Sequence, residues 1–318
     1  MDEKRLRARL GELAQRHGHW LWDVPLGHGL WTGGNRGLPQ TRLKRIVQVV
    51  HDLVRKPLSE CRILDLASLE GQFAIEMAHQ GAAVVGIELR EANIEKARFL
   101  KEALGLRNLA FHQDDVRNIS VEKYGRFDAI ICSGILYHLR AGEAIDLARA
   151  MHAMAERAVI IDTHVSLRAE QEYRREGKSY WGRVYAEHRR NATAAEKAEN
   201  RLASADNETS FWFTRPSLIN LLSDAGFSSI YECFVPIHMN RGRKGTGFPD
   251  RCTFACLRDP TTELVTSPAA NLLREQWPEG TLSYAPPTPL RRAKAAIGRM
   301  ARRVRAGIRQ GGSPGPPG

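Results

Sequence analysis

Two acids placed after two apolar strands are the residues best suited to bind a ligand. Residues 61–88 read as an apolar strand, a tight turn, a helix and a second apolar strand. Asp65 lies near the end of the first strand and Glu88 at the end of the second. An acid in this second position can accept hydrogen bonds from both hydroxyls of a ribose. The segment therefore predicts half of a nucleotide-binding α/β unit, and a βαβ unit without a ligand is the alternative.

The turn between the first strand and the helix decides how closely a ligand can approach the backbone. Ala67 and Ser68 are small, and Gly71 opens the helix, so the N–H groups of the turn can face a ligand. The chain has no Gly-x-Gly-x-x-Gly pattern for a dinucleotide pyrophosphate and no Walker lysine. The pattern therefore disfavours dehydrogenases and nucleotide-hydrolysing enzymes.

Two further segments place polar groups where parallel strands end. Asp115 follows the third strand in FHQDDV, where its carboxylate could accept from an adenine amine while the Val116 N–H faces a ring nitrogen. Asp114 is the neighbouring alternative. The run FDAIICSGILYHL brings Ser133 and Gly134 to the end of the fourth strand. Ligands of open α/β sheets bind at this edge, so these residues are candidates for the same site.

A histidine near a reacting hydroxyl can act as a general base. Asp162 and His164 end the fifth strand two positions apart, so both can face one cavity and the acid can orient the histidine. A divalent metal is a weaker interpretation, because two ligands are too few. A strand-end pair bonded to the backbone is another alternative. His138, which we expect with Tyr137 at the start of the next helix, is the second base candidate or a packing residue.

Apolar strands and amphipathic helices alternate through the middle of the chain, which indicates a parallel sheet covered on both faces. We expect an α/β fold: a Rossmann-like, seven-stranded, mostly parallel sheet whose last strand is antiparallel. The predicted strands are 61–66, 83–88, 108–112, 127–133, 158–163, 228–236 and 251–257, and the helices are 71–80, 92–104, 141–155 and 216–225.

The sequence divides into three parts. Residues 1–57 are an N-terminal helical cap and loop, with helices at 4–17 and 41–56 and Thr41 as the N-cap of the second. Residues 58–259 form the main domain, which carries a polar, aromatic insertion at 164–212. Residues 260–318 are a linker followed by a basic helix at 289–309.

Charge and cysteine content restrict the partners. The net charge is +11, but eight arginines and lysines follow Glu279, which leaves about +3 for the rest (11 − 8). The body is therefore not a strongly basic nucleic-acid binder. The basic tail could bind an anionic membrane surface or RNA, or remain solvated. The five cysteines are scattered, the chain has no apolar run of about 18 residues, and its start is charged. These features predict a cytoplasmic protein. If the tail binds lipid, the protein would be peripheral to the inner membrane surface.

The run LDLASLEGQF…VVGIE…FHQDDV…FDAIICSGILYHL resembles class I S-adenosylmethionine-dependent methyltransferases. Within them it is most similar to the branch that includes tRNA wobble-uridine carboxymethyl-type transferases and bacterial small-molecule or glycan methyltransferases. The strongest resemblance covers residues 61–140. It implies S-adenosyl-L-methionine as the cofactor, bordered at its methionine part by Asp65, Ala67, Ser68 and Gly71, at its ribose by Glu88, at its adenine by Asp115 and Val116, and flanked by Ser133 and Gly134.

One feature departs from the family pattern. Ala67 and Leu69 occupy the positions of the first two glycines of the turn, and only Gly71 remains. A leucine disfavours positive φ, so we expect the turn to follow a slightly different path.

The resemblance implies methyl transfer to an acceptor. We expect O-methylation of a hydroxyl of a glycan, glycolipid or secondary metabolite, with His164 as the first base candidate, His138 as the second and Asp162 in support. The alternatives are a tRNA wobble-uridine methyltransferase, which the nearly neutral body disfavours, and a binding protein without activity. We expect no metal. The acceptor pocket should lie between the N-terminal loop and the 164–212 insertion.

Overall fold

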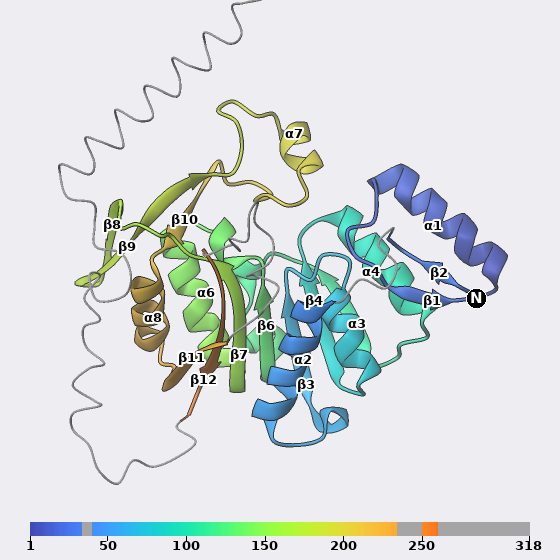
Figure 1. Ribbon diagram of the computed structural model, residues 1–318, viewed down its shortest axis with the longest axis horizontal. Helices are drawn as coiled ribbons and strands as arrows, with labels where there is room; N and C mark the ends of the chain where they lie inside the picture. Colours follow the sequence, from blue (N-terminus) through green and yellow to red (C-terminus); the bar gives the residue numbers. More distant parts are fainter. Residues whose placement is uncertain (34–39, 234–249, 260–318) are drawn as a thin grey trace, which may run out of the picture.

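The computed structural model describes residues 1–33, 40–233 and 250–259, and its centre is a seven-stranded sheet (Figure 1). The strand order is β11-β12-β7-β6-β3-β4-β5, in which β12 runs antiparallel to both of its neighbours and β3 to β7 are parallel. The predicted fold class is therefore confirmed. The strands are β3 (Arg62–Leu66), β4 (Ala83–Glu88), β5 (Leu109–Gln113), β6 (Phe127–Ser133), β7 (Ala155–His164), β11 (Ser229–Cys233) and β12 (Arg251–Leu257).

Helices cover both faces of this sheet because successive strand residues point to opposite sides. In β3, Ile63 packs into one core while Leu64 and Leu66 pack into the other. The first core lies under α1 (Glu3–His17), α2 (Thr41–Val54), α3 (Gln72–His79) and α4 (Glu91–Ala103). The second lies under α6 (Ala141–Met154) and α8 (Arg215–Asp224).

Most predicted boundaries lie within a few residues of those observed, but two local predictions are wrong. Thr41 is the first residue of α2, whose N-cap is Gln40 without a side-chain cap bond. Tyr137 and His138 do not begin a long helix, because they form a 3₁₀ turn, η3 (Leu136–His138). The α6 helix starts at Ala141 behind a capping box made by Arg140 and Glu143. The 3₁₀ turn keeps His138 at the edge of the sheet.

The 164–212 insertion folds into its own layer. Its strands β8 (Gln171–Arg175), β9 (Lys178–Ala186) and β10 (Thr209–Phe213) form an antiparallel sheet in the order β10-β9-β8. The helix α7 (Ala194–Glu199) and the loop after it return from β9 to β10 above the main sheet (Figure 1). The N-terminal loop adds a small hairpin of β1 (Pro25–Gly27) and β2 (Leu30–Trp31). The remaining short elements are η1 (Leu58–Glu60), η2 (Val116–Asn118) and α5 (Val121–Tyr124).

The predicted linker and basic helix of 260–318, and the connection at 234–249, lie outside the described residues. Among the residues that are described, no helix is long and apolar enough to cross a bilayer.

A buried ion pair connects the N-terminal segment to the main domain. The Lys96 Nζ on α4 lies 3.0 Å from the Glu70 Oε1, and neither side chain is exposed. Lys96 also donates to the carbonyls of Gly18 and His19, both at 2.9 Å, and Glu70 accepts from the Leu21 N–H at 2.8 Å. Burial lowers the pKa of Lys96. Each charge is therefore compensated by several bonds that reach across elements.

Replacing Lys96 by Met should destabilise the protein strongly, because Glu70 would remain buried without its cation. We expect a loss of about 3–5 kcal/mol in the free energy of unfolding, measured by urea denaturation. Arg149→Met is a matched control, since its ion pair with Glu176 is 40% and 56% exposed. It should cost less than about 1 kcal/mol. Equal losses in the two variants would contradict a special role for the buried pair.

Candidate active site

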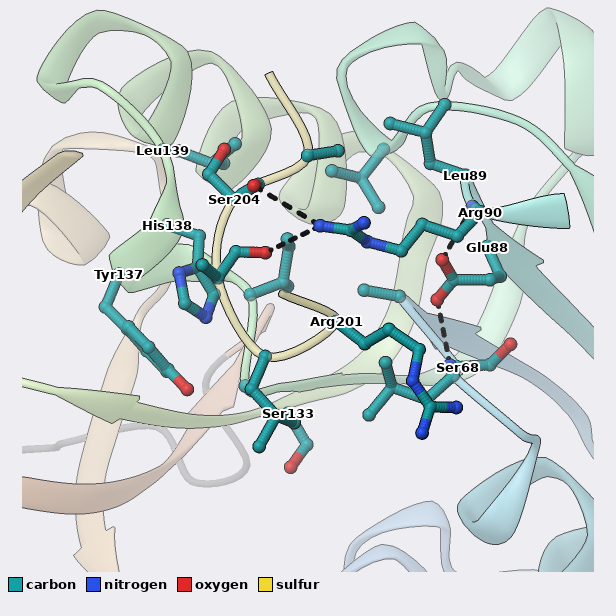
Figure 2. Close-up of a pocket in the computed structure, with 18 of the residues that line it drawn as sticks. Ser68, Glu88, Leu89, Arg90, Ser133, Tyr137, His138, Leu139, Arg201 and Ser204 are labelled. Carbon is teal, nitrogen blue, oxygen red and sulfur yellow. Dashed lines mark hydrogen bonds between the residues drawn. The ribbon is translucent and has the colours of Figure 1, made fainter. Parts of the chain in front are cut away.

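A cavity of about 310 Å³ opens where the parallel strands β3, β4 and β6 end (Figure 2). This volume is typical of a site for a small molecule. Its walls come from the β3–α3 turn, the ends of β4 and β6, the 3₁₀ turns η2 and η3, and residues 201–206 of the insertion. The lining residues include Ala67, Ser68, Leu69, Glu88, Leu89, Arg90, Asp115, Val116, Arg117, Ser133, Gly134, Ile135, Tyr137, His138, Leu139 and Arg251.

The β3–α3 turn adopts the left-handed backbone that glycines usually supply. The φ angles are 51° at Ala67, 50° at Leu69 and 87° at Gly71. The expectation that Leu69 would change the path of the turn is therefore wrong. A left-handed residue other than glycine costs about 1–2 kcal/mol. The bond from the Leu69 N–H to the Glu88 Oε2, at 3.0 Å, holds this conformation.

Two residues expected at the ligand lie behind the wall of the cavity. Asp65 is 1% exposed, and its Oδ2 accepts from the Ala74 N–H at 3.0 Å, near the start of α3. Gly71 is needed for packing, because a Cβ there would lie 2.5 Å from the Phe111 ring. Neither residue lines the cavity, and both support the turn from behind it.

Glu88 faces the cavity, as expected, although it is only 4% exposed. Its carboxylate accepts from two main-chain N–H groups, those of Leu69 and Arg90. Burial raises the pKa of Glu88, and these bonds partly offset the rise. A carboxylate offers about four acceptor positions, so Glu88 can accept from a ligand as well.

Asp115 and Val116 also line the cavity, at the start of the 3₁₀ turn η2. The Asp115 carboxylate binds the Arg117 guanidinium, whose Nε lies 3.0 Å from each oxygen. Arg117 in turn lies 2.7 Å from Asp206 of the insertion. Asp114, the alternative adenine ligand, lies outside the lining and accepts from Lys123 and Tyr124.

Two hydroxyls mark the polar part of the cavity. The Ser68 Oγ and the Ser133 Oγ are both buried, and neither has a hydrogen-bond partner in the described part of the chain. Both residues line the cavity, Ser68 from the turn and Ser133 from the end of β6 (Figure 2). Buried polar groups are normally bonded, so orphaned hydroxyls in the cavity that Glu88 also lines fit a polar ligand such as an adenosyl amino acid.

His138 is the histidine that lines the cavity, and it is held from behind by a buried acid. Its Nδ1 lies 2.8 Å from the Glu187 Oε2. Glu187 also accepts from the Ser210 Oγ at 2.6 Å and from the Ser204 N–H at 2.9 Å. Burial alone would raise the pKa of Glu187, but the bonds from His138, Ser210 and Ser204 outweigh it and lower the pKa. The acid is therefore ionised at neutral pH and fixes the imidazole.

His164 and Asp162 do not form the expected pair at the cavity. The His164 ring stacks on Trp212 with centroids 4.8 Å apart, and its Nδ1 lies 3.4 Å from Asp250. Asp162 is fully buried and accepts from the Arg251 Nε and the Thr253 Oγ1, each at 2.8 Å. Neither His164 nor Asp162 lines the cavity. No group of three or more possible metal ligands occurs among the residues that the structure describes.

Sequence analysis did not predict the contacts that Arg90, Glu187 and Arg251 make at the site. Arg90 could have been found, since it follows Glu88 by two positions. Glu187 and Arg251 could not, because their partners His138 and Asp162 are 49 and 89 positions away. No local pattern reports such pairs.

Residues 57–201 match a family described as a methyltransferase domain. A second comparison agrees in fold: the N-terminal domain of EvdMO1, crystallised in the presence of SAH and D-fucose, superposes with a TM-score of 0.60. The two are 23% identical over 81% of this chain and 96% of that chain. Residues 57–201 therefore form a methyltransferase domain, and the superposition agrees with this in fold.

Curated relatives match part of the chain. The chain is 26% identical over 166 residues to the O-antigen chain terminator bifunctional methyltransferase/kinase WbdD of Escherichia coli, a match that covers 51% of this chain and 22% of that enzyme. It is 31% identical over 78 residues to the ubiquinone biosynthesis O-methyltransferase of Acinetobacter baylyi, covering 24% of this chain and 33% of that enzyme. These matches thus span between a fifth and a third of the curated relatives.

The raised pKa of Asp65 should make the stability of the protein depend on pH. Burial, reinforced by the charge of Glu88, raises its pKa from 3.8 to about 8. Between these values the folded protein keeps a proton that the unfolded chain has released, so stability falls as pH rises through this window. Asp65→Asn, which keeps an acceptor for the Ala74 N–H, removes this term. We expect the variant to gain stability over the parent more at pH 8 than at pH 5, measured by urea denaturation. An equal difference at both pH values would contradict the shifted pKa.

Proposed function

We propose that this protein transfers a methyl group from S-adenosylmethionine to a hydroxyl of a small, sugar-like acceptor. The observation that carries the proposal is a histidine in the cavity wall, His138, whose Nδ1 is bound by the buried carboxylate of Glu187. An oriented imidazole is the equipment for removing a proton from a neutral hydroxyl. An amine acceptor would need such a base less.

The cavity has the groups needed to hold the donor. Glu88 would accept from the ribose hydroxyls, and the apolar side of Val116 would lie against the adenine. The unpartnered hydroxyls of Ser68 and Ser133 would bind polar atoms of the donor. When bound, S-adenosylmethionine supplies a methyl group activated by the positive charge on sulfur. The protein's remaining tasks are to position the acceptor and to exclude water.

Glu187 determines which nitrogen of His138 can act as the base. An ionised carboxylate only accepts hydrogen bonds, so the Nδ1 of His138 must carry the proton that is shared with it. The Nε2 then has the free lone pair and can take the proton of the acceptor hydroxyl. As the imidazolium forms, the negative charge of Glu187 stabilises it. For this reason we place the base role on His138 and not on His164, which Trp212 and Tyr137 surround.

The acceptor would lie at the Tyr137 end of the cavity. Arg251 enters the same wall, with its guanidinium carbon 5.4 Å from the centre of the Tyr137 ring. An aromatic ring and a guanidinium beside a base are suited to an acceptor that carries several hydroxyls. Two similar proteins support a sugar acceptor, since WbdD is an O-antigen chain terminator and the EvdMO1 domain was crystallised in the presence of D-fucose.

The partners of the tail remain predictions. The basic segment 289–309 lies outside the described residues, so its binding to a membrane or to RNA stays a prediction, as does the cytoplasmic location.

Replacing His138 by Ala should lower kcat by about 10²–10⁴, the usual contribution of a general base. Donor affinity, measured by titration calorimetry with S-adenosylhomocysteine, should stay within about threefold of the parent, since only the acceptor's proton depends on this side chain. His164→Ala serves as the comparison and should keep most of the turnover. A loss of turnover in His164→Ala together with normal turnover in His138→Ala would overturn the assignment.

Removing the Glu88 carboxylate should weaken the binding of the donor and leave the binding of the acceptor unchanged. Glu88→Ala deletes the acceptor for the ribose hydroxyls and releases the Leu69 N–H, so S-adenosylhomocysteine should bind at least about tenfold more weakly.

The parent protein with labelled donor should methylate a polyhydroxylated sugar fraction and leave tRNA unlabelled. Labelling of tRNA alone would favour the wobble-uridine alternative. Absence of donor binding by the parent would leave only a protein without activity.

A further inference from the structure

The cavity is covered by a segment of the insertion that we call the lid, residues 197–206. It begins in the last turn of α7, and its residues 201–206 form one wall of the cavity. The lid therefore comes from a different layer of the fold than the turn and the strand ends that it faces. Its docking must be secured by bonds to the main domain.

Arg90 supplies most of these bonds. Its guanidinium donates to five main-chain carbonyls, at distances between 3.0 and 3.3 Å. Figure 2 shows the guanidinium pointing toward Ser204. These carbonyls belong to Lys197, Ala198, Asn200, Ala203 and Ser204. All five bonds come from Nη1 and Nη2, whose four N–H groups lie in one plane, so one N–H is shared between two carbonyls. The single ammonium of a lysine cannot reproduce this arrangement. One side chain therefore makes most of the bonds that hold the lid.

The position of Arg90 connects the lid to the expected ribose site. Its main-chain N–H donates to the Glu88 Oε1 at 2.8 Å. Two further contacts support the closed lid from either side. Asp206 pairs with Arg117 at 2.7 Å, and Arg201 lies 3.4 Å from Glu70. The lid is thus attached to the same elements that shape the donor pocket.

The far side of the lid reaches the base. The Ser204 N–H donates to the Glu187 Oε2, and this same oxygen binds the Nδ1 of His138. A continuous path of hydrogen bonds therefore runs from Glu88 through Arg90, Ser204 and Glu187 to His138. In an open lid, Glu187 would lose one of its N–H donors and would hold the imidazole less firmly.

We propose that Arg90 and the lid are positioning elements, which orient His138 through Ser204 and Glu187 only when the lid is closed over a bound donor. The inference deepens the proposed function and rests on it. Donor binding at Glu88 stabilises the backbone that carries Arg90, and Arg90 in turn holds the lid. The acceptor therefore meets an oriented base only in the presence of the donor.

The test compares Arg90→Gln with Arg189→Gln, a matched control at an arginine near the lid whose side chain is 82% exposed and bonds to Glu196. Hydrogen exchange of the amides in 200–206 is measured with and without S-adenosylhomocysteine. In the parent and the control, the ligand should slow exchange at Ser204 and its neighbours. In Arg90→Gln, this protection should be lost although the ligand still binds in calorimetry.

Turnover provides the second measurement. Misplacing a catalytic group by about 1 Å can cost about 100-fold, so Arg90→Gln should lower kcat by about 10- to 100-fold with little change in the acceptor KM. Arg90→Lys, which keeps the charge but not the five donors, should fall between Arg90→Gln and the parent. It also provides the test if the glutamine variant does not fold.

Two results are decisive and distinguish this proposal from the proposed function. Normal lid protection and normal kcat in Arg90→Gln, with His138→Ala inactive, would overturn the lid proposal alone. Full turnover in His138→Ala would instead remove the proposed base, and the relay with it. Loss of both the amide protection and kcat in Arg90→Gln, with both retained in Arg189→Gln, would support the lid proposal.

Discussion

The structure of the site depends on how three buried acids hold one strained turn. Glu88 bonds to the Leu69 N–H, Asp65 bonds to the N-terminal turn of α3, and Glu70 binds Lys96 and the N-terminal segment. Each acid points in a different direction, so the turn is fixed from three sides. This restraint replaces the conformational freedom that two absent glycines would have given. The turn also forms part of the cavity wall, through Ala67, Ser68 and Leu69.

Burying three acids so close together is unfavourable, and the molecule compensates each in a different way. Asp65 keeps its proton, since burial raises its pKa to about 8. Glu70 pairs with the buried cation of Lys96. Glu88 accepts from main-chain N–H groups and keeps room for a ligand. Of the three, Glu88 is the acid that lines the cavity, which suits its proposed role at the ribose.

The opposite wall of the cavity is also held by a buried acid, Glu187. Glu187 is also buried and multiply bonded, but its bonds lower its pKa and keep it ionised beside His138. One of those bonds comes from the lid. The insertion thus contributes both the acid that binds His138 and the segment that forms one wall of the cavity.

The sequence by itself determined the order of strands and helices, the antiparallel last strand and the edge at which Glu88, Val116 and Ser133 meet. These features depend on local periodicity and on the rule that ligands bind where parallel strands end, so they can be read without coordinates. Only the tertiary structure decided which histidine faces the cavity. Strand alternation predicts the face of the sheet on which His164 lies, but it does not predict which side chain covers the ring. In the structure Trp212 stacks on the His164 ring. His138 acquires its partner, Glu187, from the insertion just after β9, and the left-handed backbone of Leu69 is held by Glu88. Both result from contacts between residues distant in the chain, which no local pattern encodes.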